Sequence, residues 1–234
     1  MIHAYGHPDP PVPRLLEALA ARGHTVSAAA ARRPEPPDGR PSTLVLASGD
    51  APDPLALGVL LGAWRSAPRA RVLVLSRLGA HPDARAPGLR ALWRLEEHAR
   101  ASGLPTLTLR LAPLLGPRTP LWTLLRTRPR LPRGGRDVVQ PALETEAVET
   151  VHRALEGGVA WDGWYEVAGE EAWTLAELAG RAAALGPPPA GARGRWEPPL
   201  EEIAEHRLAE PGPWRAAFGL SPSRVSEVIA GWGP

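Results

Sequence analysis

Short apolar runs rich in valine and leucine alternate with longer segments of helical period, and this alternation is the feature that most constrains the fold. The strand candidates are residues 1–4, 24–29, 43–47, 71–76 and 106–111. The helix candidates between them are residues 12–22, 54–66 and 88–102. Strands that alternate with helices build a mostly parallel sheet covered on both faces. The sequence therefore predicts an α/β, Rossmann-like, doubly wound sheet.

The second half of the chain differs from the first in composition. Proline and glycine become frequent beyond residue 117, and seven of the nine tryptophans lie beyond residue 120. Further helices are expected at residues 144–156, 174–185, 200–208 and 221–230, with a strand at 164–167. We expect a Rossmann-like domain over residues 1–117 and a smaller, mostly helical, mixed α/β lobe over 118–234, interleaved with the first.

The late tryptophans allow two interpretations. Those after residue 160 are Trp161, Trp164, Trp173, Trp196, Trp214 and Trp232. Large side chains are needed to fill the core of a small lobe, which favours a structural role. Alternatively, some of them form an aromatic pocket or a protein interface.

Residue types that are missing exclude several kinds of chemistry. The chain has no cysteine and no lysine, so thiolate sites, Schiff bases and Walker-type phosphate loops are excluded. Its net charge is only +2 and it has no basic run, so nucleic acid is not an expected partner. No apolar stretch reaches membrane-spanning length, so we expect a soluble cytoplasmic protein. The scarcity of thermolabile residues and the 29 prolines suggest a thermophile.

Five stretches, in this order, resemble the extended or atypical branch of the short-chain dehydrogenase/reductase family, whose members include NAD-dependent epimerases and dehydratases. They are residues 14–26, 71–80, 96–117, 138–156 and 164–186. The most similar is EEHARASGLPTLTLRLAPLLGP, which resembles the helix, strand and turn that border the family's nicotinamide and substrate cleft. The resemblance implies a fold that binds NAD(P).

The family's glycine-rich phosphate loop falls on Gly6, Asp9 and Val12, in the sequence YGHPDPPV. Only the first glycine is present, the prolines remove N–H donors, and the carboxylate of Asp9 stands where the pyrophosphate would bind. One interpretation is a structural turn in which Asp9 caps the following helix. The alternative is a modified cofactor loop.

The resemblance places the family's catalytic serine near Ser76 and its tyrosine and lysine on Leu89 and Trp93. Neither Leu89 nor Trp93 can transfer a proton, and the chain's only tyrosines are Tyr5 and Tyr165. We therefore assign no catalytic residue, and we expect NAD(P) affinity to be weak or absent.

If a cofactor binds, the resemblance points to six residues that would hold it: Gly6, Arg32, Arg33, Ser48, Ser76 and Leu111. Arg32 and Arg33 stand where the family often places an arginine for the 2′-phosphate of NADP. The simpler interpretation is a solvated basic turn.

Two groups have incomplete metal-ligand patterns. They are His3, His7 and Asp9, and the i, i+4 pair Glu202 and His206. Neither matches a complete motif, so no metal site is predicted. The adjacent Glu96 and Glu97 are expected on the exposed side of a helix.

These features favour a non-catalytic or strongly diverged member of the family, a pseudoenzyme that acts through a residual small-molecule cleft or a protein interface. The alternative is a divergent NAD(P)-dependent reductase or epimerase. The partner would be an unknown small molecule or a protein, and a homo-oligomer is possible.

Overall fold

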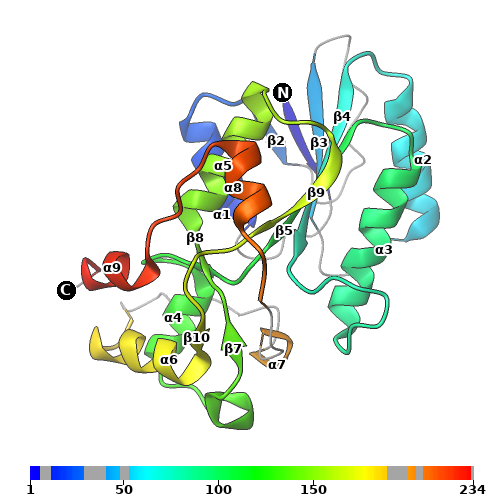
Figure 1. The fold of residues 1–234 in the computed structure, drawn as a ribbon. Helices are drawn as coiled ribbons and strands as arrows, with labels where there is room; N and C mark the ends of the chain where they lie inside the picture. Colours follow the sequence, from blue (N-terminus) through cyan, green and yellow to red (C-terminus); the bar gives the residue numbers. More distant parts are fainter. Residues whose placement is uncertain (6–11, 29–40, 48–52, 189–199, 204–207, 233–234) are drawn as a thin grey trace. The chain divides into compact units, whose positions relative to one another are not determined.

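The computed structural model describes residues 1–5, 12–28, 41–47, 53–188, 200–203 and 208–232 of the 234-residue chain (Figure 1). The chain forms two compact units. The first unit comprises Met1–Arg110 and His152–Tyr165, and the second comprises Leu111–Val151 and Glu166–Pro234. The chain therefore passes between the units three times.

A six-stranded sheet organises the fold, in the order β2-β1-β3-β4-β5-β9 (Figure 1). The strands are β1 (Ile2–Tyr5), β2 (Val26–Ala28), β3 (Ser42–Leu46), β4 (Ala70–Arg77), β5 (Thr106–Leu111) and β9 (Asp162–Val167). β1 pairs in parallel with both β2 and β3, and β3 pairs in parallel with β4. The apolar runs thus form the mostly parallel sheet that the sequence predicts.

Helices cover both faces of this sheet. They are α1 (Val12–Ala21), α2 (Pro54–Arg65) and α3 (Pro87–Ala101). The buried apolar residues of α2 and α3 share one core cluster with those of β3 and β4, whereas α1 lies on the other side of the sheet (Figure 1). Each helix buries residues three or four positions apart, which is the amphipathic pattern seen in the sequence.

The strand order reverses its direction between β1 and β3, because β2 lies on one side of β1 while β3 and β4 follow on the other. In open α/β sheets, ligands bind beyond the carboxyl ends of the strands at such a switch point. The fold therefore places its expected ligand edge where β1 ends at Tyr5 and β3 ends at Leu46.

The second unit is built from short elements around its own core. They are β6 (Leu114–Leu115), α4 (Pro120–Arg126), the 3-10 helix η1 (Pro132–Gly135), β7 (Val138–Val139), β8 (Ala142–Leu143), β10 (Trp173–Thr174), α6 (Leu175–Ala184), α7 (Leu200–Ile203), α8 (Gly212–Phe218) and α9 (Val225–Ala230). The helix α5 (Glu144–Glu156) has residues in both units. β6 pairs with β8 in parallel and β10 pairs with β7 in antiparallel orientation.

The structure supports a core role for two of the late tryptophans, and it does not test the aromatic-pocket or interface role. Trp214 is fully buried in the second unit and its indole N–H donates to Thr150 Oγ1 at 3.0 Å, as a core residue should. Trp232 packs edge-on against the buried Trp122, which belongs to a core cluster of the second unit. Trp164, by contrast, is 49% exposed, and Trp196 lies outside the described residues.

None of the helices in the described part of the chain combines the length and the apolar character needed to cross a membrane.

Candidate functional site

Most of the predicted cofactor positions follow the strands at the ligand edge. In the sequence, Gly6 directly follows β1, and Ser48 comes two residues after the end of β3. Both lie outside the described residues, as do Asp9, Arg32 and Arg33. Their roles stay predictions. Val12 is described: it opens α1 and is buried, so its branched side chain occupies space where the family's loop would have a glycine.

Ser76 lies near the carboxyl end of β4 and is 1% exposed. Its hydroxyl is buried and makes no hydrogen bond to any residue that the structure describes. A buried hydroxyl without a partner costs free energy, and the role of Ser76 in cofactor binding stays a prediction. Leu111, the last residue of β5, belongs to the second unit and is buried.

The positions that the resemblance assigns to the family's tyrosine and lysine lie in or against the hydrophobic core. Leu89 on α3 is 0% exposed and belongs to the cluster that α2, α3 and the sheet share, and Trp93 packs against the same cluster. A shift of one residue in the alignment would place Gly88 and Leu92 there instead. In either alignment, α3 offers no hydroxyl or ammonium group for proton transfer.

The prediction that Glu96 is exposed is wrong. Glu96 is 0% exposed, and its carboxylate accepts three hydrogen bonds from Arg110 on β5. Nε donates to Oε1 at 3.1 Å and to Oε2 at 3.2 Å, and Nη2 donates to Oε2 at 2.6 Å. Arg110 also stacks on the ring of Trp164, with its guanidinium carbon 4.5 Å from the ring centroid. Helical periodicity assigns a charged residue to the solvent face, and only the partner on β5 explains its burial. Glu97 lies on the exposed side and pairs with Arg100, as expected.

The two predicted metal-ligand groups are only partly described. His3 lies on β1, and its ring packs edge-on against Trp64 with a centroid separation of 5.2 Å. Burial lowers the pKa of His3, and the positive amino terminus adds to this effect. His7 and His206 lie outside the described residues, and the side chain of Glu202 is likewise not described.

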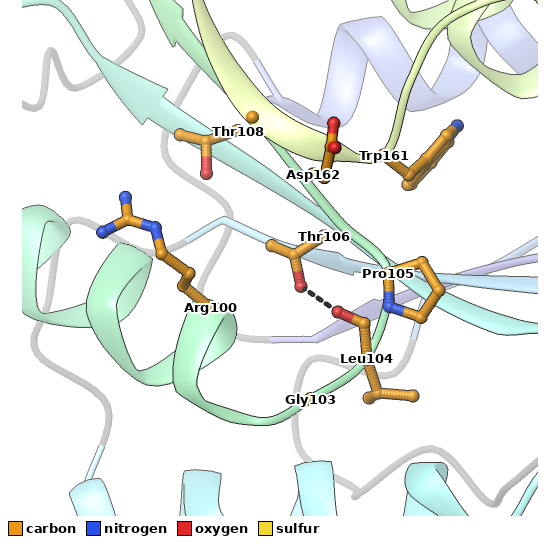
Figure 2. Close-up of a pocket in the computed structure, with 9 residues that line it drawn as sticks. Arg100, Gly103, Leu104, Pro105, Thr106, Thr108, Trp161 and Asp162 are labelled. Carbon is orange, nitrogen blue, oxygen red and sulfur yellow. Dashed lines mark hydrogen bonds between the residues drawn. The ribbon is translucent and has the colours of Figure 1, made fainter.

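The first unit contains a pocket of about 440 Å³ at the amino ends of β5 and β9 (Figure 2). Its lining includes the side chains of Arg100, Thr106, Thr108, Trp161 and Asp162. Such a volume suits a small molecule, and the lining offers a cation, a carboxylate, hydroxyls and an aromatic ring. The sequence did not predict this pocket, because its residues come from the end of α3 and from two strands about 55 positions apart.

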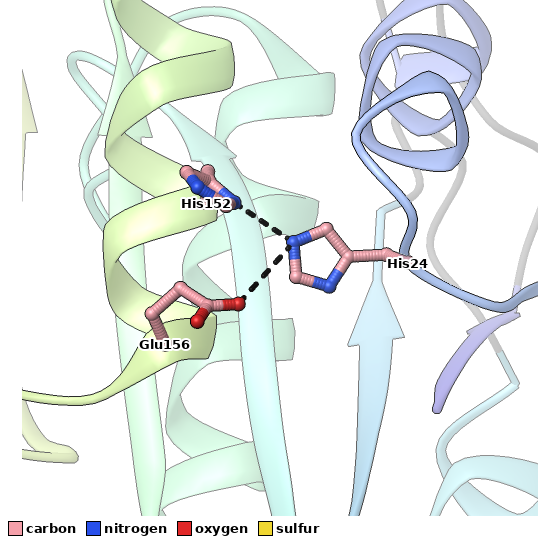
Figure 3. A group of neighbouring side chains, drawn as sticks. All are labelled: His24, His152 and Glu156. Atoms are coloured by element: carbon pink, nitrogen blue, oxygen red, sulfur yellow. Dashed lines mark hydrogen bonds and ion pairs between the residues drawn. The ribbon is translucent and has the colours of Figure 1, made fainter.

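The first unit also contains a cluster that the sequence analysis missed. His24, in the turn before β2, lies beside His152 and Glu156 on α5 (Figure 3). Nε2 of His24 is 2.9 Å from Nδ1 of His152 and 3.9 Å from Oε1 of Glu156. Burial lowers the pKa of His24, and His152 lowers it further. The i, i+4 spacing of His152 and Glu156 on a helix was a visible signal, but His24 joins them only in the fold.

Neither a family model nor a curated protein matches this sequence. Its fold, however, matches solved structures along almost its whole length. MoeE5, solved with UDP-glucuronic acid and NAD, is 18% identical, with a TM-score of 0.70 over 99% of this chain and 98% of that one. The UDP-glucuronic acid 4-epimerase of Bacillus cereus, solved with the same two ligands, is 12% identical, with a TM-score of 0.70 over 99% and 96%.

A third structure, the UDP-glucose 4-epimerase of Thermus thermophilus in complex with NAD, is 18% identical, with a TM-score of 0.67 over 98% of this chain and 96% of that one. The protein shares the Rossmann-like fold of these NAD-containing structures. This confirms the Rossmann-like fold that the sequence predicts. At these identities the likeness concerns the fold, so the chemistry has to be judged from the residues of this chain.

Proposed function

We propose that this protein is a non-catalytic or strongly diverged member of the extended short-chain dehydrogenase/reductase family, and that it acts by binding rather than by turnover. The observation that carries this proposal is that Leu89 is buried in the hydrophobic core that α2, α3 and the sheet share, with the partly buried Trp93 packed against it. Oxidation of an alcohol by NAD requires removal of the hydroxyl proton as the hydride leaves. Leucine and tryptophan cannot accept that proton, and the chain contains no lysine to lower the pKa of a tyrosine.

Two kinds of partner are compatible with a binding function, a small molecule and a protein. The pocket beside Thr106 and Asp162 supports the first, because its lining includes hydrogen-bonding groups of both charges and the side chain of Trp161. A ligand that carries hydroxyl groups and no strong net charge would match this lining. The exposed ring of Trp164 supports a protein interface.

A second candidate function is that of a divergent NAD(P)-dependent reductase or epimerase. It is supported by the unpartnered hydroxyl of Ser76 and by the likeness to structures that contain NAD. In that case the cofactor would be held by Gly6, Arg32, Ser48, Ser76 and Leu111.

A thermal-shift titration with NAD, NADH, NADP and NADPH separates cofactor binding from its absence. A ligand with a Kd of about 10 μM, added at about 1 mM, stabilises the native state by about 2.7 kcal/mol. For a chain of this size that corresponds to a rise in Tm of roughly 5–11 °C. The same samples, mixed with UDP-glucose or UDP-glucuronic acid, are then assayed for reduced nicotinamide and for epimerised sugar.

Turnover of either sugar nucleotide would overturn the proposal and establish the second candidate. Absence of turnover, with or without a shift in Tm, is the result that we expect. Ser76→Ala is the informative variant: it should remove any shift caused by a cofactor that reaches the ligand edge. Ser102→Ala is its matched control, because this buried hydroxyl already donates to Ala99 O at 2.6 Å.

A further inference from the structure

The side chains of His24, His152 and Glu156 converge on a small volume at one edge of the first unit (Figure 3). Their ligand-type atoms, two imidazole nitrogens and a carboxylate oxygen, all lie within 4.8 Å of one another. The two imidazole rings meet edge to face, with their centroids 5.2 Å apart. The cluster therefore brings together three lone-pair donors from two separate elements.

Hydrogen bonds among these three side chains cannot satisfy both acceptors that face His24. Nε2 of His24 faces both Nδ1 of His152 and the carboxylate of Glu156 (Figure 3). A neutral imidazole carries one N–H, so Nε2 can donate to only one of these two acceptors. A metal ion in the same place accepts lone pairs from all three atoms at once.

We propose that His24, His152 and Glu156 bind a divalent first-row transition metal ion of the zinc type, with water completing the coordination. In a tetrahedral site with bonds of about 2.0–2.1 Å, the ligand atoms lie about 3.3 Å apart. The separations of 2.9 and 3.9 Å from His24 Nε2 bracket that value, and all three ligand atoms lie within 4.8 Å of one another. Side-chain rotations that bring the atoms closer would complete the site. Two imidazoles and one carboxylate are ligands that Zn²⁺ accepts readily, whereas Mg²⁺ and Ca²⁺ prefer oxygen alone.

The surroundings allow an ion to enter. The side chain of His24 is 16% exposed and that of Glu156 is 63% exposed, so the carboxylate side of the cluster is open to solvent. The positive charges of Arg22 and the amino terminus also act on His24. The carboxylate of Glu156 offsets part of their repulsion towards a cation.

The position of the cluster separates it from the cofactor edge. His24 precedes β2 and therefore lies at the amino end of a parallel strand, whereas dinucleotides bind at the carboxyl ends. An ion here would connect the turn before β2 to the last turns of α5. Arg71 already holds this end of α5, because its Nη2 donates to Leu155 O at 2.8 Å. The bound ion would thus stabilise the first unit rather than act on a substrate at the nicotinamide cleft.

Titration of the tag-free, chelator-treated protein with Co²⁺ tests the site directly. Co²⁺ replaces Zn²⁺ in sites with nitrogen and oxygen ligands, and a low-coordinate complex gives strong visible absorption. We expect one equivalent to bind, Zn²⁺ to displace it, and Mg²⁺ to leave it in place. Zn²⁺ should also raise the Tm of the protein.

Three variants and a control locate the ligands. His24→Ala, His152→Ala and Glu156→Gln should each weaken Co²⁺ binding by more than about tenfold. Glu156→Gln keeps the shape of an exposed side chain, so this variant should fold normally and a loss of binding can be attributed to the lost ligand. His98→Ala is the matched control, because His98 is an exposed histidine on α3 whose Nδ1 lies 2.7 Å from the backbone oxygen of Arg94. It should bind Co²⁺ as the wild type does.

The proposal is overturned if the wild type gives no visible band and no shift in Tm with Zn²⁺. It is also overturned if His152→Ala and Glu156→Gln bind Co²⁺ as tightly as His98→Ala, because the ion would then bind elsewhere. Neither result bears on the lack of turnover proposed above, since the two sites share no residue.

Discussion

Replacement of Glu96 by glutamine tests the most consequential contact in the first unit. Glu96 on α3 is fully buried, and its carboxylate pairs through three hydrogen bonds with Arg110, whose side chain is 16% exposed. Glutamine keeps the shape of the side chain but removes its charge and one of its acceptor oxygens. The guanidinium of Arg110 would then remain largely buried without a counter-charge.

The expected loss is large for a single substitution. Removal of one partner of a buried ion pair costs about 3–5 kcal/mol, because the remaining charge is left uncompensated. At about 2–4 °C per kcal/mol for a chain of this size, Tm should fall by roughly 6–20 °C. The exposed pair of Glu97 and Arg100 on the same helix provides the comparison, since such a pair contributes only about 0.2–0.5 kcal/mol.

The assay is thermal unfolding followed by circular dichroism, with Glu96→Gln and Glu97→Gln measured side by side. A third protein, with Glu96→Leu and Arg110→Met combined, removes both charges and should lose less stability than Glu96→Gln alone. The reasoning is refuted if the two single variants have the same Tm. It is also refuted if the double variant is less stable than Glu96→Gln.

Three further predictions concern the second unit. Gly169→Ala should lower the free energy of unfolding by about 1–3 kcal/mol, because its new Cβ would clash with the backbone carbonyl oxygen of Pro141. Gly163→Ala in the first unit is the control: its new Cβ would meet open space, so Tm should change little. Burial raises the pKa of Glu146 above its usual value of 4.5. The folded state therefore loses stability as pH rises through the raised pKa, because the buried carboxyl must ionise. Glu146→Gln removes this group, so Tm should fall less between pH 4.5 and neutrality. Trp214→Phe should cost about 1–3 kcal/mol in urea unfolding, because it leaves a buried hydroxyl with one partner fewer, and Trp164→Phe at an exposed ring should cost much less.

The elements of the first unit were predictable from local pattern. The runs that form β3, β4 and β5 are short, apolar and separated by amphipathic helices, and each was located within one or two residues of its observed bounds. Such elements are determined by which side chains must be buried, and that information is local in the sequence. The short strands β6, β7, β8 and β10 were not predicted, because two residues carry no periodicity.

The residues of the candidate sites also include some features that the sequence determined and others that only the fold determined. The sequence alone determined that the chain has no lysine and only two tyrosines, because residue identity limits chemistry whatever the fold; the placement of a proton-transfer pair on Leu89 and Trp93 stays a prediction from the resemblance. Only the tertiary structure decided that Glu96 is buried against Arg110, and that His24 meets His152 and Glu156 from 128 positions away. Burial of a charge and convergence of ligands depend on partners that are distant in the chain, and no local pattern encodes such partners.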